Sequence, residues 1–275
     1  MKLFVSSDIE GTCGIAHWDE TEIGKPGYDR FSGQMTKEVA AVCETALQSG
    51  KTQEILIKDA HDSARNLKAE ELPEEVKILR GWVGVPCNMM AGVRGCDAAV
   101  MTGYHSGAYS DGNPLSHTSN THNMFVKING EFASEFRINA MFAAYCGIPV
   151  LFVSGDRALC ASAETIVPGI VTAPVSEGMG GAALSVQPGR ALKMIRTGMT
   201  KVMEVLPADP AEQKAYLRSK VIPLPEKMHV EVCFKDLEAA QHGSNYPGAV
   251  RDDAKQISFD TADFYEAVRF LYFVL

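Results

Sequence analysis

Two acidic side chains one residue apart, Asp8 and Glu10, follow an apolar run at the start of the chain. If that run is a strand, both side chains extend to the same face, because side chains alternate along an extended chain. Two carboxylates held this close repel each other unless a cation lies between them. The pair is therefore either part of a metal site or two solvated loop acids. The residue that follows, Gly11, lets the backbone turn away behind them.

Two later apolar segments end in side chains of the same kind. The second predicted strand ends at Asp59 and His61, and a third, over 97–103, ends at His105. The helical pattern over 30–48 makes the start of the chain a βαβ unit with parallel strands. Because the carboxyl ends of parallel strands meet at one edge of a sheet, we expect all these polar tips to lie together.

Two more candidates follow the third strand. A loop rich in glycine, serine and asparagine over 106–123 contains His117 and could close over the same edge. Asn129-Gly130 is the favoured two-residue turn of a β-hairpin. A helix then begins near Glu135, which places this carboxylate in the first turn, beside the positive end of the helix.

These residue types suit a transition metal. The candidates for one site are the acidic and imidazole side chains at the predicted strand and helix ends: Asp8, Glu10, His61, His105, His117 and Glu135. Carboxylate and imidazole without thiolate suit zinc, manganese or iron. The set exceeds what one tetrahedral zinc needs, whereas two ions sharing a carboxylate would use it. Two ions about 3.5–4 Å apart are the usual arrangement for hydrolysing amides or phosphate esters.

The alternation of strands and helices continues to about residue 206 and predicts an α/β fold. We expect a mainly parallel sheet in three layers, with helices on both faces, over residues 1–207. Four prolines between 207 and 225 mark a boundary. A smaller C-terminal α+β unit over 222–275 follows, and the hairpin region 115–133 is a candidate to join it in space. This unit shows no catalytic constellation, so we assign it to packing or to an interface.

Composition excludes several classes of partner. The net charge of −8 and a pI near 5.4 argue against nucleic acid and against an anionic membrane. No segment approaches the roughly 20 apolar residues of a membrane span, and no secretory signal is visible. The seven cysteines are scattered without a C-x-x-C pair, which is typical of reduced thiols. We therefore expect a cytoplasmic protein.

The residues at these positions resemble the DppA-type D-aminopeptidases, a family of zinc metallopeptidases also described as dipeptide transport proteins. The resemblance covers most of the chain and rests on short motifs whose order and spacing are specific together. They are Ser7-Asp8-Ile9-Glu10-Gly11, Asp59-Ala60-His61, Gly103-Tyr104-His105, Leu115-Ser116-His117, Ile128-Asn129-Gly130 with Glu135 and Asn139, and Ser154-Gly155-Asp156.

The resemblance implies a metal-dependent aminopeptidase that hydrolyses the N-terminal amide bond of short peptides or amino-acid amides, with D-residues preferred. A water bridging two zinc ions would attack the amide; manganese or another divalent metal is the alternative. The implied metal ligands are Asp8, Glu10, His61, His105 and Glu135, with Asp8 as the bridge. The implied catalytic residue is His117, as an acid or as a hydrogen-bond donor to the oxyanion. A ring-shaped homo-oligomer, a decamer, is also implied.

The sequence departs from the family pattern beside two of these ligands. Glu135 is followed by Phe136-Arg137, where small or aliphatic residues are more usual, and His61 is followed by Asp62 rather than a small hydroxyl residue. Both departures bear on substrate preference rather than on the chemistry. Asp59 either orients a ligand or caps its strand end. The other histidines are interpreted as surface or core residues: His17, His122, His229 and His242.

Two alternative functions stay open on the residues alone. A dinuclear phosphoesterase would need cationic groups near the metals, and the site segments are poor in lysine and arginine apart from Arg137. A peptide-binding or transport component that holds metal only structurally would need a closed ligand set with no free position.

Overall fold

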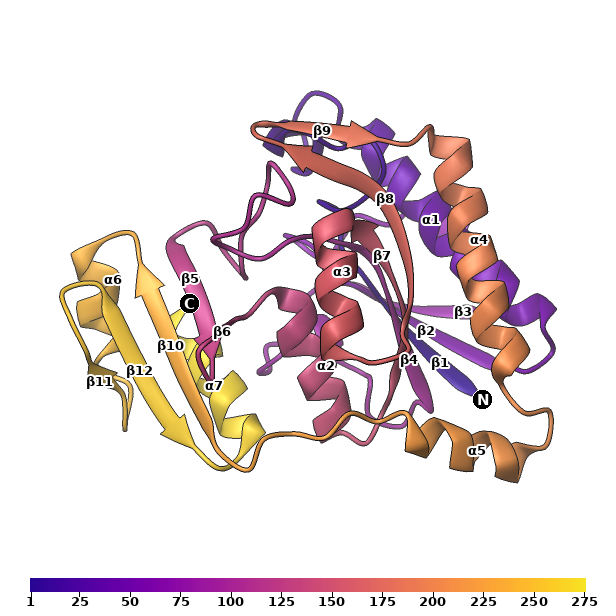
Figure 1. Cartoon of the computed structure of the whole chain (residues 1–275). Helices are drawn as coiled ribbons and strands as arrows, with labels where there is room; N and C mark the ends of the chain where they lie inside the picture. Colours follow the sequence, from indigo (N-terminus) through magenta and orange to yellow (C-terminus); the bar gives the residue numbers. More distant parts are fainter.

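The computed structural model describes all 275 residues and contains two β-sheets (Figure 1). The larger sheet has seven strands in the order β3-β2-β1-β4-β7-β8-β9. Its strands are β1 (Lys2–Ser7), β2 (Glu54–Asp59), β3 (Val76–Leu79), β4 (Ala98–Tyr104), β7 (Val150–Asp156), β8 (Val171–Met179) and β9 (Ala182–Ser185). All neighbours pair in parallel except β8 and β9. The predicted mainly parallel α/β fold is confirmed.

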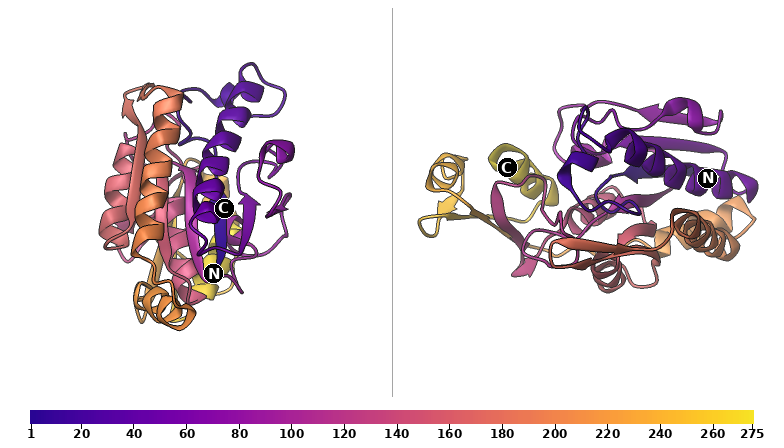
Figure 2. Two further views of the ribbon diagram at one scale, coloured as in Figure 1. Left: turned by 90° about the vertical axis from the view of Figure 1, so that its right-hand side faces the viewer. Right: turned by 90° about the horizontal axis from the view of Figure 1, so that it is seen from above.

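Helices cover both faces of this sheet (Figure 2). On one face lie α1 (Tyr28–Gln48) and α4 (Pro188–Val205), and on the other lie α2 (Glu135–Tyr145) and α3 (Arg157–Ile166). The split follows from the period of two along each strand. In β1, Leu3 and Val5 pack with α1 and α4, whereas Phe4 packs in the cluster that contains α2.

The smaller sheet is antiparallel, with five strands in the order β11-β12-β10-β5-β6. Its strands are β5 (Asn123–Ile128), β6 (Glu131–Phe132), β10 (Met228–Phe234), β11 (Val250–Arg251) and β12 (Gln256–Thr261). The predicted hairpin turn is confirmed, since Asn129 and Gly130 both have positive φ, 53° and 80°. The middle of the chain thus supplies β5, which pairs with β10.

Helix α2 lies between the two sheets. The remaining helices of the chain are α5 (Pro210–Ser219), α6 (Leu237–Gly243) and α7 (Phe264–Val274), with short 3-10 turns η1 (Trp18–Glu20), η2 (Ala69–Glu71) and η3 (Asn88–Met90). Phe136 of α2 and Val268 of α7 belong to one buried cluster, which also contains Phe4 of the large sheet. One continuous core therefore joins α7 to the large sheet through α2.

The glycine-rich segment 178–181 connects two strands of the large sheet. Gly178 lies inside β8, and Gly180 and Gly181 form the turn into β9. The backbone of Gly178 closely approaches a loop, since its N–H donates to the carbonyl oxygen of Gly112 at 2.9 Å. A Cβ at Gly178 would lie 2.5 Å from the carbonyl oxygen of Asp111, so a side chain has no room there.

No helix in the structure combines the length and the apolar character that crossing a membrane requires.

Candidate metal centre

The first acidic pair lies where the backbone leaves β1 beside the end of β4. The N–H of Gly11 donates to the carbonyl oxygen of Gly103 at 2.8 Å. A Cβ on Gly11 would lie only 1.8 Å from the carbonyl oxygen of Tyr104, so glycine is required here for close approach. This docking buries both carboxylates, and Asp8 and Glu10 are only 2% and 1% exposed.

Two imidazoles reach this pair from the strands on either side of β1. His61 follows β2, and its Nδ1 lies 3.4 Å from Asp8 Oδ1 and 3.1 Å from Glu10 Oε2. His105 follows β4, and its Nε2 lies 3.5 Å from Asp8 Oδ2. The strand order reverses direction between β1 and β4, which is where open α/β sheets bind ligands. The structure therefore brings together the strand tips that the spacing predicts.

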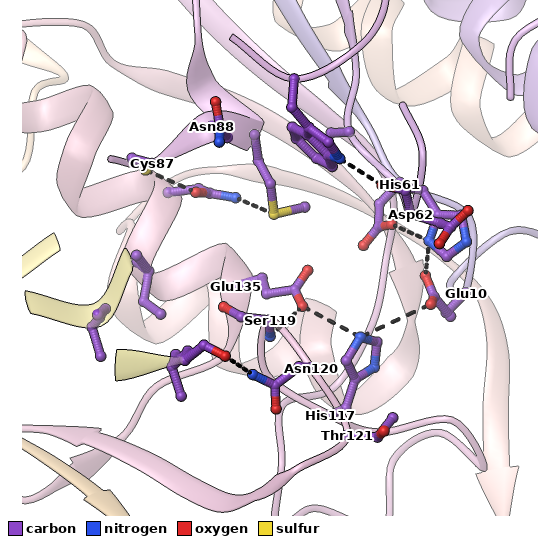
Figure 3. A pocket seen from close by; sticks show the side chains of 18 of the residues that line it. Glu10, His61, Asp62, Cys87, Asn88, His117, Ser119, Asn120, Thr121 and Glu135 are labelled. Carbon is purple, nitrogen blue, oxygen red and sulfur yellow. Dashed lines mark hydrogen bonds and ion pairs between the residues drawn. The ribbon is translucent and has the colours of Figure 1, made fainter. Parts of the chain in front are cut away.

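Glu135 and His117 complete the cluster. Ser134 caps α2 by accepting a hydrogen bond from the backbone N–H of Arg137 at 3.2 Å, which fixes Glu135 in the first turn as predicted. Glu135 Oε2 lies 3.6 Å from His105 Nε2, and Glu135 Oε1 lies 3.5 Å from His117 Nε2. Figure 3 shows His117 directed toward both Glu135 and Glu10.

Backbone carbonyls fix the orientation of the three imidazoles. Each ring has one nitrogen 2.9 Å from a carbonyl oxygen: His61 Nε2 at Thr21, His105 Nδ1 at Ser106, and His117 Nδ1 at Leu115. That nitrogen must carry the proton, because a carbonyl oxygen only accepts. In a neutral ring the other nitrogen then offers its lone pair toward the carboxylates. This is the arrangement of histidines that bind metals.

Several buried atoms of the cluster have no hydrogen-bond partner. They are Asp8 Oδ2, Glu10 Oε2 and His105 Nε2. An unpaired buried polar atom costs about 1–3 kcal/mol, so three in one cluster need a common explanation. The ligand atoms form three groups, each within 4.8 Å: Asp8 with Glu10 and His61; Asp8 with His105 and Glu135; and Glu10 with His105 and His117. The donor set fits a bound cation.

The charges of the cluster depend strongly on one another. Burial, together with the neighbouring carboxylate of Glu10, raises the pKa of Asp8 well above its usual range. Burial also acts to raise the pKa of Glu10, but the imidazoles, led by His61, outweigh it and hold that pKa well below its usual range. Burial is likewise outweighed at Glu135, where His105 lowers the pKa to about 2. The carboxylates therefore need positive charge beside them.

The neighbouring carboxylates raise the pKa values of two of the histidines. Burial acts to lower the pKa of both rings, but Glu10 and Asp8 raise the pKa of His61 well above its usual range. Glu135 does the same for the pKa of His105. The same carboxylates that would hold a cation thus attract a proton onto the imidazoles when no cation is bound.

Asp59 acts on the cluster through an intermediate residue. Its Oδ2 accepts backbone N–H bonds from Asn66 and Leu67 at 2.5 and 2.8 Å, and its Oδ1 accepts from Asn66 Nδ2 at 2.8 Å. Asn66 Nδ2 also donates to the carbonyl oxygen of His61 at 2.7 Å. Asp59 therefore fixes the loop that carries His61 and does not touch the imidazole ring.

The two departures beside the ligands have different surroundings. Phe136 is fully buried against the ring of Tyr104, with ring centroids 6.5 Å apart. Arg137 extends toward Glu131, at 4.0 Å, and neither residue lines the cavity at the cluster. Asp62 does line that cavity, with a left-handed φ of 43°. Only Asp62 is therefore placed to contact a substrate.

A cavity of about 580 Å³ opens at the cluster, and much of its lining was missed by sequence reasoning. The missed residues come from loops and from α7, and include Trp18, Trp82, Asn120, His122, Val268, Leu271 and Tyr272. His122 was interpreted as a surface or core residue, and the types of the others carry no metal-ligand or acid–base signal. The spacing of Phe264, Val268 and Leu271 is typical of the buried face of a helix, and it does not distinguish the part of α7 that lies at the cavity. Figure 3 shows Asn120 and Thr121 beside His117 at the rim.

Comparison with known proteins identifies the family. A family model described as D-aminopeptidase matches residues 1–273. The chain belongs to this family. This D-aminopeptidase family member is 29% identical over 278 residues to a D-aminopeptidase of Bacillus subtilis, covering 97% of the chain and 94% of the relative. The resemblance inferred from the motifs is confirmed, as is an enzyme of the metal-dependent aminopeptidase class.

A solved structure gives the same result for the fold of this D-aminopeptidase family member. The neighbour is the Zn-dependent D-aminopeptidase DppA from Bacillus subtilis, described as a self-compartmentalizing protease. The TM-score is 0.88 at 26% identity, over 100% of this chain and 96% of the neighbour. Both sheets therefore have counterparts in a solved member of the family.

Proposed function

We propose that this protein is a zinc-dependent D-aminopeptidase that releases the N-terminal residue of short peptides or amino-acid amides. The observation that carries the proposal is the buried cluster of three carboxylates and three imidazoles, which contains unpartnered polar atoms and of which all residues but His105 line a cavity. Family membership supports the aminopeptidase activity, and the descriptions of the relatives support the D-preference and the zinc.

The ligand set favours two ions. One would be held by Asp8, Glu10 and His61, and the other by Asp8, His105 and Glu135, so that Asp8 bridges them. The proposal is supported by the two groups of ligand atoms that share Asp8. Three protein ligands per zinc leave a position for water or substrate, as catalytic zinc sites do. Manganese or another divalent metal is the alternative occupant.

Bound there, the ions would supply Lewis acidity to the scissile carbonyl and lower the pKa of a water molecule. The chain itself contributes orientation. Carbonyl contacts hold His61 and His105 with their free nitrogens toward the carboxylates. Asp59 and Asn66 hold the backbone of the loop that follows β2.

His117 is the proposed catalytic residue. Its ring stacks on His105 with centroids 4.3 Å apart and meets the edge of Trp18 at 5.3 Å, so its position is fixed. Because Nδ1–H donates to a carbonyl, Nε2 can donate a proton only from the imidazolium. A protonated His117 would donate to the developing oxyanion or to the leaving amine. A neutral His117 would instead accept a proton.

Location, domain organisation and assembly belong to the same proposal. We place the enzyme in the cytoplasm, which its seven free cysteines support. The division into 1–207 and 222–275, with 115–133 joining the second unit, is supported by the two sheets. A ring-shaped homo-oligomer, a decamer, is supported by the self-compartmentalizing neighbour.

The first test is metal content combined with a substrate screen. We expect close to two transition-metal ions per chain by mass spectrometry of the purified protein. Removal by a chelator should abolish hydrolysis of D-alanine amide, and added zinc should restore it. L-alanine amide is the control for stereochemistry. Protein that binds no metal at neutral pH would overturn the proposal.

A phosphate monoester in the same screen tests the phosphoesterase alternative. The lining of the cavity contains no lysine or arginine, which disfavours a phosphate substrate. We therefore expect no phosphatase activity. Metal binding without hydrolysis of any amide or peptide would favour the peptide-binding alternative.

A further inference from the structure

One wall of the cavity is apolar and faces the metal cluster across it. Val268, Leu271 and Tyr272 of α7, Ile138 of α2 and Met89 of η3 line this side, here called the α7 wall. Figure 3 shows α7 in yellow on one side of the cavity and Glu10 with His61 on the other. The wall therefore belongs to the same cavity as the proposed active site.

The spacing along α2 connects the wall to the cluster. Ile138 follows the proposed ligand Glu135 by three residues, so both lie on one face of the helix with Cβ atoms about 5–6 Å apart. Successive residues of an extended peptide are about 3.3–3.6 Å apart. A substrate with its scissile carbonyl at the cluster would therefore reach the wall with a side chain next to that bond.

The five side chains that form the wall carry no charge. The charged side chains of α7, Glu266 and Arg269, form an ion pair with each other and line a different surface hollow. A charged substrate group against the α7 wall would lose hydration without gaining a partner. An apolar group would bury surface there, including that of Tyr272, which is 42% exposed.

From this arrangement we propose that the α7 wall is a subsite for an aliphatic or aromatic substrate side chain adjacent to the scissile bond. The inference rests on the proposed function and adds a substrate class to it. The side chain belongs either to the released residue or to the residue that follows the bond. Both present the same chemistry to the wall.

Adjacent residues of α7 provide a matched pair of variants. Tyr272 lines the cavity, whereas Phe273 is 62% exposed and lies at the other hollow with Glu266 and Arg269. Tyr272→Ala should lower kcat/KM about tenfold for an apolar substrate and about twofold for an alanine substrate, because the ring contact is lost. Phe273→Ala should leave the ratio of the two values unchanged.

Two substrate series identify which side chain binds. Comparing D-leucine amide with D-alanine amide varies only the released residue. Comparing D-alanyl-D-leucine with D-alanyl-D-alanine varies only the following residue. A leucine preference that Tyr272→Ala removes in either series supports the subsite and names its occupant. Equal ratios for the wild type and Tyr272→Ala in both series would overturn it.

A binding measurement separates this inference from the proposed function. Calorimetry with the metal-loaded protein should show D-leucine binding about tenfold more tightly than D-alanine. Val268→Thr, which keeps the shape but replaces a methyl group with a hydroxyl, should reduce that difference. Absence of hydrolysis would overturn the proposed function while the binding ratio still decides the subsite. Equal affinity for the two amino acids would overturn the subsite.

Discussion

The two walls of the cavity come from regions built in different ways. The proposed metal cluster uses single polar side chains at the ends of parallel strands and at a helix start, and backbone carbonyls hold its imidazole rings. The α7 wall uses apolar side chains from a helix that packs on an antiparallel sheet. Chemistry at a metal depends on fixed atomic positions, whereas an apolar subsite depends on shape and surface. Substitutions at the cluster should therefore abolish turnover, whereas substitutions at the wall should change substrate preference.

The largest effect is expected at the proposed bridge. Asp8→Asn should reduce the metal content below two ions per chain and lower kcat at least about a thousandfold, because both ions lose a charged ligand. Metal analysis and steady-state kinetics measure the two effects. Asp62→Asn makes the same change at a neighbouring strand end and should retain both metals. Full metal content in Asp8→Asn would contradict the bridge.

His117 tests whether the cluster contains a residue that acts without holding metal. His117→Ala should keep the metals and lower kcat about a hundredfold to ten-thousandfold, the usual range for a general acid or base. His122→Ala, the other non-ligand histidine of the cavity, is the control. If His117→Ala loses metal as well, the group of Glu10, His105 and His117 describes a ligand set instead.

Glu38 tests the support of the loop that follows Glu10. Its substitution should have the smallest of these effects, a change in the free energy of unfolding. Its Oε1 accepts from the backbone N–H of Cys13 and from Gln34 Nε2, both at 3.0 Å, and holds the loop that follows Glu10. Burial raises the pKa of Glu38 to about 7. The folded state therefore holds this proton more tightly than the unfolded state, where the pKa is near 4.5.

This difference in pKa sets the direction in which the stability changes with pH. The stability contributed by protonated Glu38 is present below pH about 4.5 and is lost as the pH rises to about 7. Glu38→Gln cannot ionise, so it should gain about 3 kcal/mol relative to the wild type between pH 4.5 and pH 8. Urea unfolding of both proteins at the two pH values measures the difference. A difference that does not change with pH would contradict the prediction.

The sequence predicts the metal cluster better than the α7 wall for a physical reason. Asp8, His61 and His105 each follow an apolar strand, and parallel topology alone brings such tips to one edge. The amphipathic pattern of α7 predicts a buried face but not its partner. Val268 and Leu271 are buried in the core that α2 shares, and nothing local distinguishes them from ordinary core residues.

Other details depended on long-range contacts that no local pattern encodes. The role of Asp59 became clear only through Asn66, which links it to the backbone of His61. The loop over 106–123 made His117 a candidate for the site, but its catalytic role came only from the family resemblance, because the loop has no periodicity that fixes the direction of the ring. The extended β8 depends on the close approach of Gly178 to Gly112.

Helix α2 carries Glu135 at the proposed metal cluster and, three residues later on the same face, Ile138 at the α7 wall. The helical rise of about 1.5 Å per residue therefore sets the distance between the proposed reaction centre and the subsite. This distance limits which part of a bound substrate can contact the wall. Loop motion cannot change this distance. Substitutions of α2 residues that pack the helix into the core, such as Phe136, should shift turnover and preference together. Substitutions of α7 residues that line the wall, such as Tyr272, should shift preference alone, so selectivity can change without altering the proposed metal ligands.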